Sequence, residues 1–268
     1  MTIQGIMPRT MYKAMKIIYR SIQTLFHRVI DKFGLRKHIF HCLVFFHAKK
    51  LPLNANRYLV IAPHPDDEVF GCAGLMHRLN QTGKDVHVVI LTQGEGVCDN
   101  PLMNVSAFIA KRRELALDAA KALGLKHEQY TFLNWGDSKV HKVHDDRNKQ
   151  KELISIIEII KPEVIFTPHI TDGHPDHIHA TKIVGNILQP SIKLMYYCIW
   201  HWYNYSILQW NKSYAMTMSK KERIAKKQAV DTYALPVDEN GFLFSGDLKY
   251  LPSYSRRRKE LFFEASQA

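Results

Sequence analysis

Residues 58–71 read YLVIAPHPDDEVFG, and this stretch decides how the chain folds. The run Tyr58–Ala62 is apolar and rich in β-branched and aromatic residues, which predicts a buried strand. His64, Asp66 and Asp67 follow the strand before a helical pattern begins. A strand, a polar turn and a helix in this order are typical of an α/β sheet, where ligands bind beyond the carboxyl ends of the strands.

A second polar turn repeats this arrangement about a hundred residues later. The run EVIFT at residues 163–167 predicts another buried strand, and HPDH at residues 174–177 follows it. Catalytic zinc usually has three protein ligands from His and carboxylate side chains. Such an ion lowers the pKa of water and polarises a carbonyl oxygen. One such turn could be explained as a helix cap alone, whereas two of them favour a hydrolytic metal site.

The residues of the first turn are also predicted to have different roles. A short turn leaving a strand can aim His64 and Asp67 at one point. Asp66 is then left beside the metal, where a general base for the attacking water should stand.

Alternating strand and helix patterns extend this prediction over residues 51–268. They predict a Rossmann-like, doubly wound, mostly parallel α/β sheet. The expected helices span residues 69–82, 106–123 and 149–160, and the expected strands span residues 58–62, 85–91, 129–133 and 164–167. Residues 1–50 are expected to form a separate basic helical extension.

Four segments together resemble the LmbE/PIG-L family of metal-dependent N-acetylglucosaminyl deacetylases, over most of residues 55–235. They are APHPDDE at residues 62–68, LTQGE at 91–95, RRE at 112–114 leading to Leu123-Gly124, and DGHPDH at 172–177. The resemblance implies that zinc is bound by His64, Asp67 and His177, although two His and one carboxylate also suit Fe(II). It implies that Asp66 is the general base.

The same resemblance implies roles around the metal. His174 would be the charged partner of the tetrahedral intermediate and a proton donor to the leaving amine. Arg112 and Asp137 would contact the sugar, although NWGD at residues 134–137 differs from the family's usual run. Glu68 is expected to orient His64 or Arg112.

The implied activity is removal of the N-acetyl group from an N-acetylglucosamine-type conjugate, either lipid-linked or soluble. Two alternatives are open. One is another metal-dependent amide hydrolase acting on an acylated small-molecule conjugate, and the other is a non-catalytic sugar- or lipid-binding relative. Tyr233 is a further candidate for lining the pocket.

Composition indicates a cytoplasmic location. The four cysteines, Cys42, Cys72, Cys98 and Cys198, form no Cys-x-x-Cys pair, which fits a reducing compartment. No run reaches about 18 apolar residues, so no transmembrane helix is expected, and the N-terminus lacks a signal-peptide pattern.

The first fifty residues carry ten Lys or Arg against one acid, Asp31, in a chain whose formal net charge is +12. Seven apolar residues between Ile18 and Phe33 fall on one helical face. A basic amphipathic helix suits an anionic membrane surface, so residues 10–48 are expected either to associate peripherally with the inner membrane face or to pack on the domain or a second subunit. Nucleic acid is not expected, because no reader motif accompanies the charge. The oligomeric state is left open.

An aromatic stretch follows the second turn. It contains Trp200, Trp202, Tyr203, Tyr205 and Trp210. Its two interpretations are stacking on a sugar ring and ordinary packing in a core or an interface.

Overall fold

The computed structural model describes residues 44, 46–97, 104–200, 212–233 and 251–265. The chain divides into two units, Met1–Phe46 and His47–Ala268, and the labelled elements belong to the second. The predicted basic helix and its membrane contact through residues 10–48 lie almost wholly outside the described residues, as do Trp202, Tyr203, Tyr205 and Trp210. Within the described part of the chain, the helices are all too short or too polar to cross a membrane.

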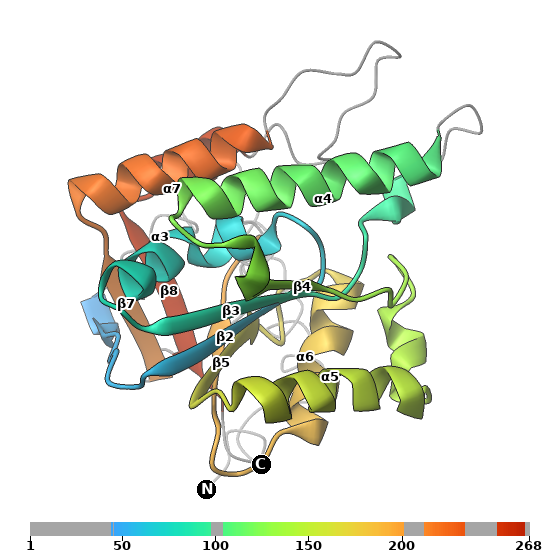
Figure 1. The fold of residues 1–268 in the computed structure, drawn as a ribbon. Coiled ribbons are helices and arrows are strands. Elements are labelled where there is room, and N and C mark those ends of the chain that lie inside the picture. The colour runs from blue at the N-terminus through green and yellow to red at the C-terminus, as the bar shows by residue number, and fades with distance from the viewer. Residues whose placement is uncertain (1–43, 45, 98–103, 201–211, 234–250, 266–268) are drawn as a thin grey trace, which may run out of the picture. The chain divides into compact units, whose positions relative to one another are not determined.

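The second unit is built on one eight-stranded sheet with the order β1-β7-β8-β6-β5-β2-β3-β4 (Figure 1). Its strands are β1 Lys49–Lys50, β2 Arg57–Ala62, β3 Asp85–Ile90, β4 Tyr130–Phe132, β5 Val164–Pro168, β6 Lys193–Tyr197, β7 Ser213–Thr217 and β8 Lys259–Glu264. Every pairing is parallel except those that β8 makes with β6 and β7. The sheet is therefore mostly parallel, as predicted.

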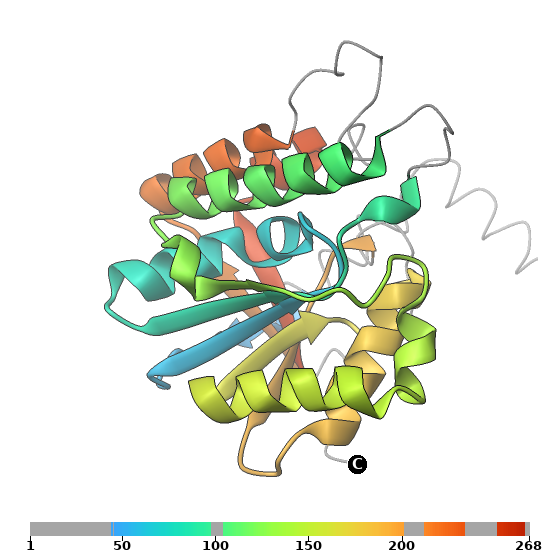
Figure 2. The same ribbon diagram turned by 45° about the vertical axis from the view of Figure 1, so that its right-hand side comes forward.

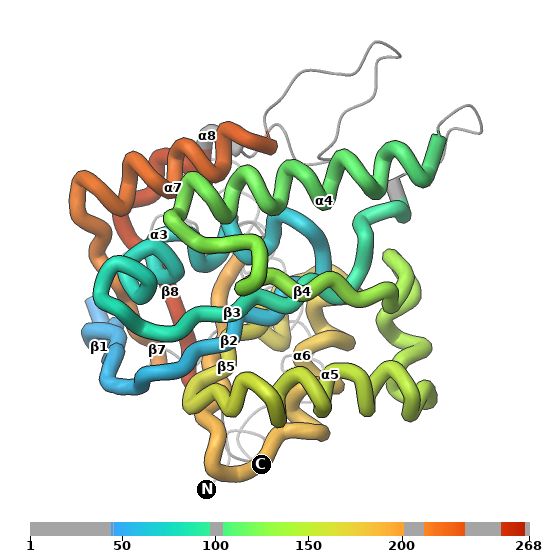
Figure 3. The backbone as a smooth tube through the Cα atoms, viewed as in Figure 1, coloured from blue at the N-terminus to red at the C-terminus, as the bar shows by residue number. Residues whose placement is uncertain are grey.

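Helices cover both faces of this sheet (Figures 1 and 2). On one face lie α3 Asp67–Gln81, α4 Val105–Ala122, α7 Lys220–Thr232 and α8 Leu251–Arg256, and on the other lie α5 Arg147–Ile160 and α6 Pro175–Ile187. The tube in Figure 3 follows the same path, with α3 and α4 passing over one face of the sheet and α5 and α6 over the other. This arrangement confirms the predicted doubly wound fold.

The helices begin where side chains cap their free amides. Asn104 accepts the amide of Ala107 at 3.0 Å at the start of α4, and Asp146 accepts two amides at the start of α5. Because Asp146 supplies that cap, α5 begins two residues before the predicted start at Lys149. It ends at Ile160, and the C-cap residue Lys161, which precedes Pro162, has a φ of 50°.

The central strands are buried on both sides, which explains their continuous apolar sequence. Five of the six residues of β2 are buried. Leu59 and Ile61 pack into the core cluster beneath α5 and α6, together with Leu153 and Ile183. This packing fixes the carboxyl end of β2, from which the first polar turn leaves.

Candidate metal centre and active site

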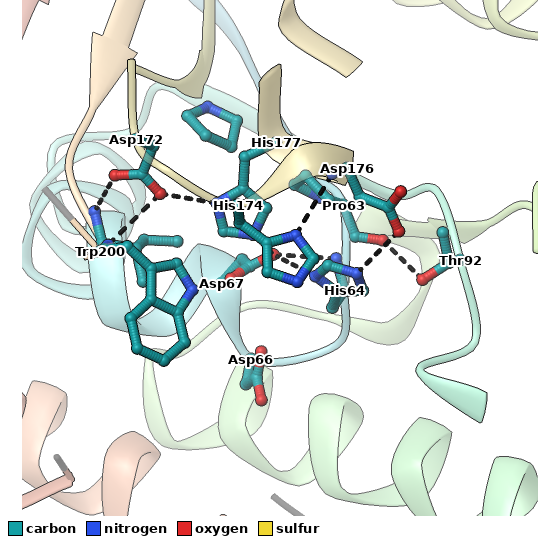
Figure 4. A network of polar contacts seen from close by, with 12 residues as sticks. Pro63, His64, Asp66, Asp67, Thr92, Asp172, His174, Asp176, His177 and Trp200 are labelled. Atoms are coloured by element: carbon teal, nitrogen blue, oxygen red, sulfur yellow. Dashed lines mark hydrogen bonds and ion pairs between the residues drawn. The ribbon is translucent and has the colours of Figure 1, made fainter. Parts of the chain in front are cut away.

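The two polar turns meet because the strands that precede them are neighbours. β2 pairs in parallel with β5, so both turns leave the same edge of the sheet. The first turn brings His64 and Asp67, and the second brings His174 and His177 from the start of α6. Figure 4 shows these four side chains directed toward one another.

The three predicted metal ligands converge on one point. Asp67 Oδ2 lies 3.1 Å from His64 Nδ1 and 3.1 Å from His177 Nε2. His177 Nε2 is buried and has no hydrogen-bond partner among the described residues, although Asp67 is close to it. Ring nitrogens of His64, His174 and His177 all lie within 4.8 Å of one another. A buried imidazole nitrogen without a hydrogen bond, beside a second imidazole and a carboxylate, fits a divalent metal.

Carboxylates contact both histidines that are predicted to bind the metal. Asp172 Oδ2 accepts from His177 Nδ1 at 2.6 Å. His64 Nε2 lies 3.3 Å from both Asp137 Oδ1 and Asp176 Oδ2. Such partners fix the tautomer and the orientation of a ligating imidazole. Sequence reasoning assigned no role to Asp172 or Asp176, although a carboxylate within a few residues of a ligating His was the available signal.

The three predicted ligands shift one another's pKa values. Burial lowers the pKa of His177, but Asp67 and Asp172 outweigh it and raise that pKa to about 9. Burial lowers the pKa of His64 as well, but the hydrogen bonds of His64 to Asp137, Asp176 and Asp67 outweigh burial and raise that pKa well above its usual value. The pKa of Asp67 is lowered because the charges and hydrogen bonds of His177 and His64 outweigh its burial.

Asp66 is held in an uncommon backbone conformation beside this set. Its φ is 134°, a region that non-glycine residues rarely adopt. Its carboxylate accepts from Arg112 Nη2 at 3.2 Å, and the same guanidinium group donates to Pro65 O at 2.5 Å. Gly94 makes room for Arg112, because a Cβ there would lie 2.9 Å from the guanidinium carbon. Strain at one residue, with several contacts that hold it, is typical of a functional position.

Glu68 was expected to orient His64 or Arg112, and this expectation was wrong. Its side chain instead contacts the backbone of Asp66 and the hydroxyl of Tyr233. Its Oε2 accepts the Asp66 amide at 3.1 Å, and its Oε1 accepts from the hydroxyl of Tyr233 at 3.3 Å. Burial, and then the charge of Asp66, raise the pKa of Glu68 to about 8. Tyr233 is fully buried behind Glu68 and is absent from the described lining of the pocket.

His174 caps α6 with its side chain. Its Nδ1 accepts the Asp176 amide at 3.3 Å, which leaves Nε2 available for a ligand. Burial, followed by the charges of His177 and His64, lowers the pKa of His174 to about 4. Two of these causes are therefore charges on the predicted ligand histidines.

A pocket of about 200 Å³ joins these groups to the predicted sugar-contacting pair. Asp137 Oδ2 accepts the Gly96 amide at 2.9 Å, and a Cβ at Gly96 would lie 2.8 Å from the Asp137 carboxyl carbon. The lining consists of His64, Asp66, Asp67, Gly94, Gly96, Arg112, Asp137, Ser138, His174, His177 and Trp200. All seven predicted site residues thus line one pocket. Gly94, Gly96 and Ser138 are additions, and Trp200 comes from the aromatic stretch.

Comparison with known proteins agrees with this geometry. The model of the PIG-L family, described as GlcNAc-PI de-N-acetylase, matches residues 59–188. The matched residues, just under half of the chain, form a PIG-L domain that carries both polar turns, and the match confirms the resemblance seen in the sequence.

Individual relatives of the PIG-L domain carry deacetylase names. Diacetylchitobiose deacetylase from Thermococcus kodakarensis is 30% identical over 133 residues, which are 48% of this chain and 48% of that protein. A 1D-myo-inositol 2-acetamido-2-deoxy-alpha-D-glucopyranoside deacetylase from Actinosynnema mirum is 31% identical over 158 residues, covering 47% of this chain and 53% of that protein. The chain spans about half the length of these curated relatives.

A solved structure shows the same fold. The N,N'-diacetylchitobiose deacetylase from Pyrococcus horikoshii superimposes with a TM-score of 0.59 at 20% identity, over 79% of this chain and 84% of that chain.

Proposed function

We propose that the protein is a zinc-dependent hydrolase that removes the N-acetyl group from an N-acetylglucosamine-type sugar conjugate. The observation that carries this proposal is the meeting of Asp66 and His174 with the metal-binding set in one pocket. The deacetylase names of the relatives support the choice of an acetamide as the bond that is cleaved.

His64, Asp67 and His177 would hold the zinc ion. Bound there, zinc would polarise the acetamide carbonyl and lower the pKa of water toward neutrality. Asp172, by accepting from His177 Nδ1, would leave the Nε2 atom of His177 to bind the ion. Asp176 and Asp137 contact Nε2 of His64 and would leave its Nδ1 atom to bind the ion.

Asp66 takes the proton of the attacking water as general base. Its carboxylate is oriented by Arg112, and its backbone by Glu68. The proton that Asp66 accepts is then available to the departing amine. His174 donates a hydrogen bond from Nε2 to the charge that develops on the carbonyl oxygen, a contribution of about 3–4 kcal/mol for one such donor.

Arg112, Asp137 and Ser138 supply polar contacts for the sugar hydroxyl groups at the pocket wall. The substrate's conjugated group, whether a lipid carrier or a small soluble molecule, lies outside this pocket. Both classes of conjugate are therefore included in the test.

The test is acetate release by purified protein reconstituted with zinc or with Fe(II). The panel holds free N-acetylglucosamine, a nucleotide sugar, an inositol-linked sugar and a polyprenyl-linked sugar. We expect release from at least one member and a loss of about 10²–10⁴ in kcat for Asp66→Asn, with the metal content unchanged. Full turnover by Asp66→Asn would overturn the assigned base. No release from any member would overturn the proposed substrate class and favour hydrolysis of another acyl conjugate.

A further inference from the structure

Trp200 occupies a position in the pocket that the proposed chemistry does not use. It follows β6 by three residues, beyond the carboxyl end of the strand. It lines the pocket together with Asp66 and His174. Figure 4 shows its indole ring at one side of the group formed by Asp67, His174 and Asp66. A large aromatic side chain therefore forms part of the pocket wall beside these groups.

Asp172 fixes this tryptophan to the metal site. Its Oδ1 accepts the amide of Ile199 at 3.1 Å, and its Oδ2 accepts the amide of Trp200 at 3.3 Å. The same Oδ2 accepts from His177 Nδ1 at 2.6 Å. The carboxylate is fully buried, so one rigid group sets both the orientation of the ligand histidine and the backbone that carries Trp200. The hydroxyl of Tyr254 adds a hydrogen bond to Ile199 O at 3.3 Å.

The rest of the pocket differs in chemistry from Trp200. Apart from the imidazole rings, Trp200 is the one aromatic residue among the described lining residues, and the others are charged, polar or glycine. The pocket measures about 200 Å³, below the roughly 300–1,000 Å³ typical of sites that enclose a whole ligand. It therefore suits the reacting end of a conjugate alone.

A pyranose ring matches a pocket with one aromatic side chain and an otherwise polar wall. Its rim carries hydroxyl groups that suit Arg112, Asp137 and Ser138, and its flat side carries C–H groups that suit an aromatic face. An acyclic acetamide offers the same bond to the metal but has no such face.

We propose that Trp200 is a specificity-determining residue that stacks on the ring of the amino sugar and selects pyranosides over acyclic acetamides. This inference rests on the proposed deacetylase function, and it names the part of the substrate that the site recognises.

The experiment compares two acetamides, the methyl glycoside of N-acetylglucosamine and N-acetylethanolamine. For Trp200→Ala we expect kcat/KM on the glycoside to fall about tenfold, mainly through KM, because an aromatic contact is lost. On N-acetylethanolamine the change should stay below about twofold. Trp200→Phe should restore most of the loss, because a smaller aromatic face remains. Ile159→Ala, which removes an 80% exposed apolar side chain on α5, is the surface control.

A binding measurement separates this inference from the proposed function. Saturation-transfer NMR with the zinc-loaded protein and the methyl glycoside should show contacts to the ring C–H protons that are lost in Trp200→Ala. Loss of these contacts in Trp200→Ala, together with a wild type that releases acetate from no member of the substrate panel, would support the stacking role of Trp200 and overturn the deacetylase proposal. An equal loss of kcat/KM on both acetamides, or unchanged ring contacts in Trp200→Ala, would overturn the role of Trp200.

Discussion

Asp172 connects the ligand histidine His177 to the backbone of residues 199–200. Its two oxygens accept from one imidazole and two backbone amides. We predict that Asp172→Asn lowers the affinity for zinc by about 10–100-fold, because an amide is a weaker acceptor for His177 Nδ1. Competition with a chromophoric chelator measures this change.

Glu158→Gln on the exposed side of α5 is the matched control for Asp172→Asn, because it removes an acidic charge far from the metal ligands. Its zinc affinity should equal that of the wild type. If Asp172→Asn kept wild-type zinc affinity, Asp172 would serve only the backbone of residues 199–200.

Glu68 is a positioning residue that acts through Asp66. Glu68→Ala removes the acceptor of the Asp66 amide and should lower kcat by at least about tenfold, with little change in KM or zinc content. Glu68→Gln should recover most of this loss, because its oxygen can accept from Asp66 and its amide can donate to the Tyr233 hydroxyl. A purely structural role would instead reduce thermal stability in both variants and leave their kcat values equal.

At the scale of elements, a buried ion pair joins α7 and β8 to α3. Lys226 Nζ lies 2.7 Å from Glu260 Oε1 and donates to Phe70 O at 3.0 Å. Glu260 also accepts the amides of Gly74 and Leu75, each at 2.8 Å. Because α3 begins at the metal-site turn, this pair anchors the helix that carries Asp67.

Breaking this pair should be costly. We predict that Lys226→Met lowers the free energy of unfolding by about 3–5 kcal/mol, since it leaves Glu260 buried without its cation. Lys227→Met is the control on the same helix, because Lys227 pairs with Asp231 at side-chain exposures of 63% and 49%. That change should cost less than about 1 kcal/mol. Urea denaturation measures both, and equal costs would contradict the importance of the buried pair.

A second link between α3 and α7 predicts a pH dependence. Arg78 donates twice to the Glu222 carboxylate at 2.7 Å. Burial raises the pKa of Glu222, but the hydrogen bonds from Arg78 outweigh burial and lower that pKa below its usual 4.5. A lowered pKa contributes stability that is present above pH 4.5 and is lost as the pH falls through the folded-state value.

Glu222→Gln can keep the capping box at Ser219, and it removes the charge together with one of the two oxygens that accept from Arg78. At pH 7 this variant should be less stable than the wild type by about 1 kcal/mol, and the difference should shrink as the pH falls below 4.5. Thermal unfolding from pH 3 to pH 7 measures it. A difference that stays constant down to pH 3 would contradict the assignment.

The sequence predicted those elements whose signals are local. Apolar runs marked β2, β3 and β5, and periodicity with caps marked α4 and α5. β8 was not predicted, because its antiparallel insertion between β6 and β7 depends on pairing with residues about forty to seventy positions away. The predicted site residues came from short motifs, whereas the contacts of Asp172 with the amides of Ile199 and Trp200 could not be predicted, because those amides lie on a separate segment.

At the scale of the whole molecule, charge is unevenly distributed. The first fifty residues carry ten Lys or Arg and one acid, in a chain with a net charge of +12. The part of the chain that bears the site is therefore close to neutral. A basic amphipathic segment gains about 1 kcal/mol for each Lys or Arg near an anionic surface, so a few charges decide whether the protein associates with vesicles.

We therefore predict that the full-length protein floats with vesicles containing phosphatidylglycerol but not with pure phosphatidylcholine, and that added salt weakens the association. Replacing Lys13, Lys16 and Arg20 by Glu should abolish flotation, because three positive charges that attract the anionic lipid become negative charges that it repels. The control replaces the exposed Lys121, Lys142 and Lys151 by Glu, which makes the same change in net charge within the catalytic unit and should leave flotation largely intact. Equal loss in both triple variants would mean that net charge alone drives the association. Absence of flotation by the wild type would favour packing of the segment on the protein itself or on a second subunit.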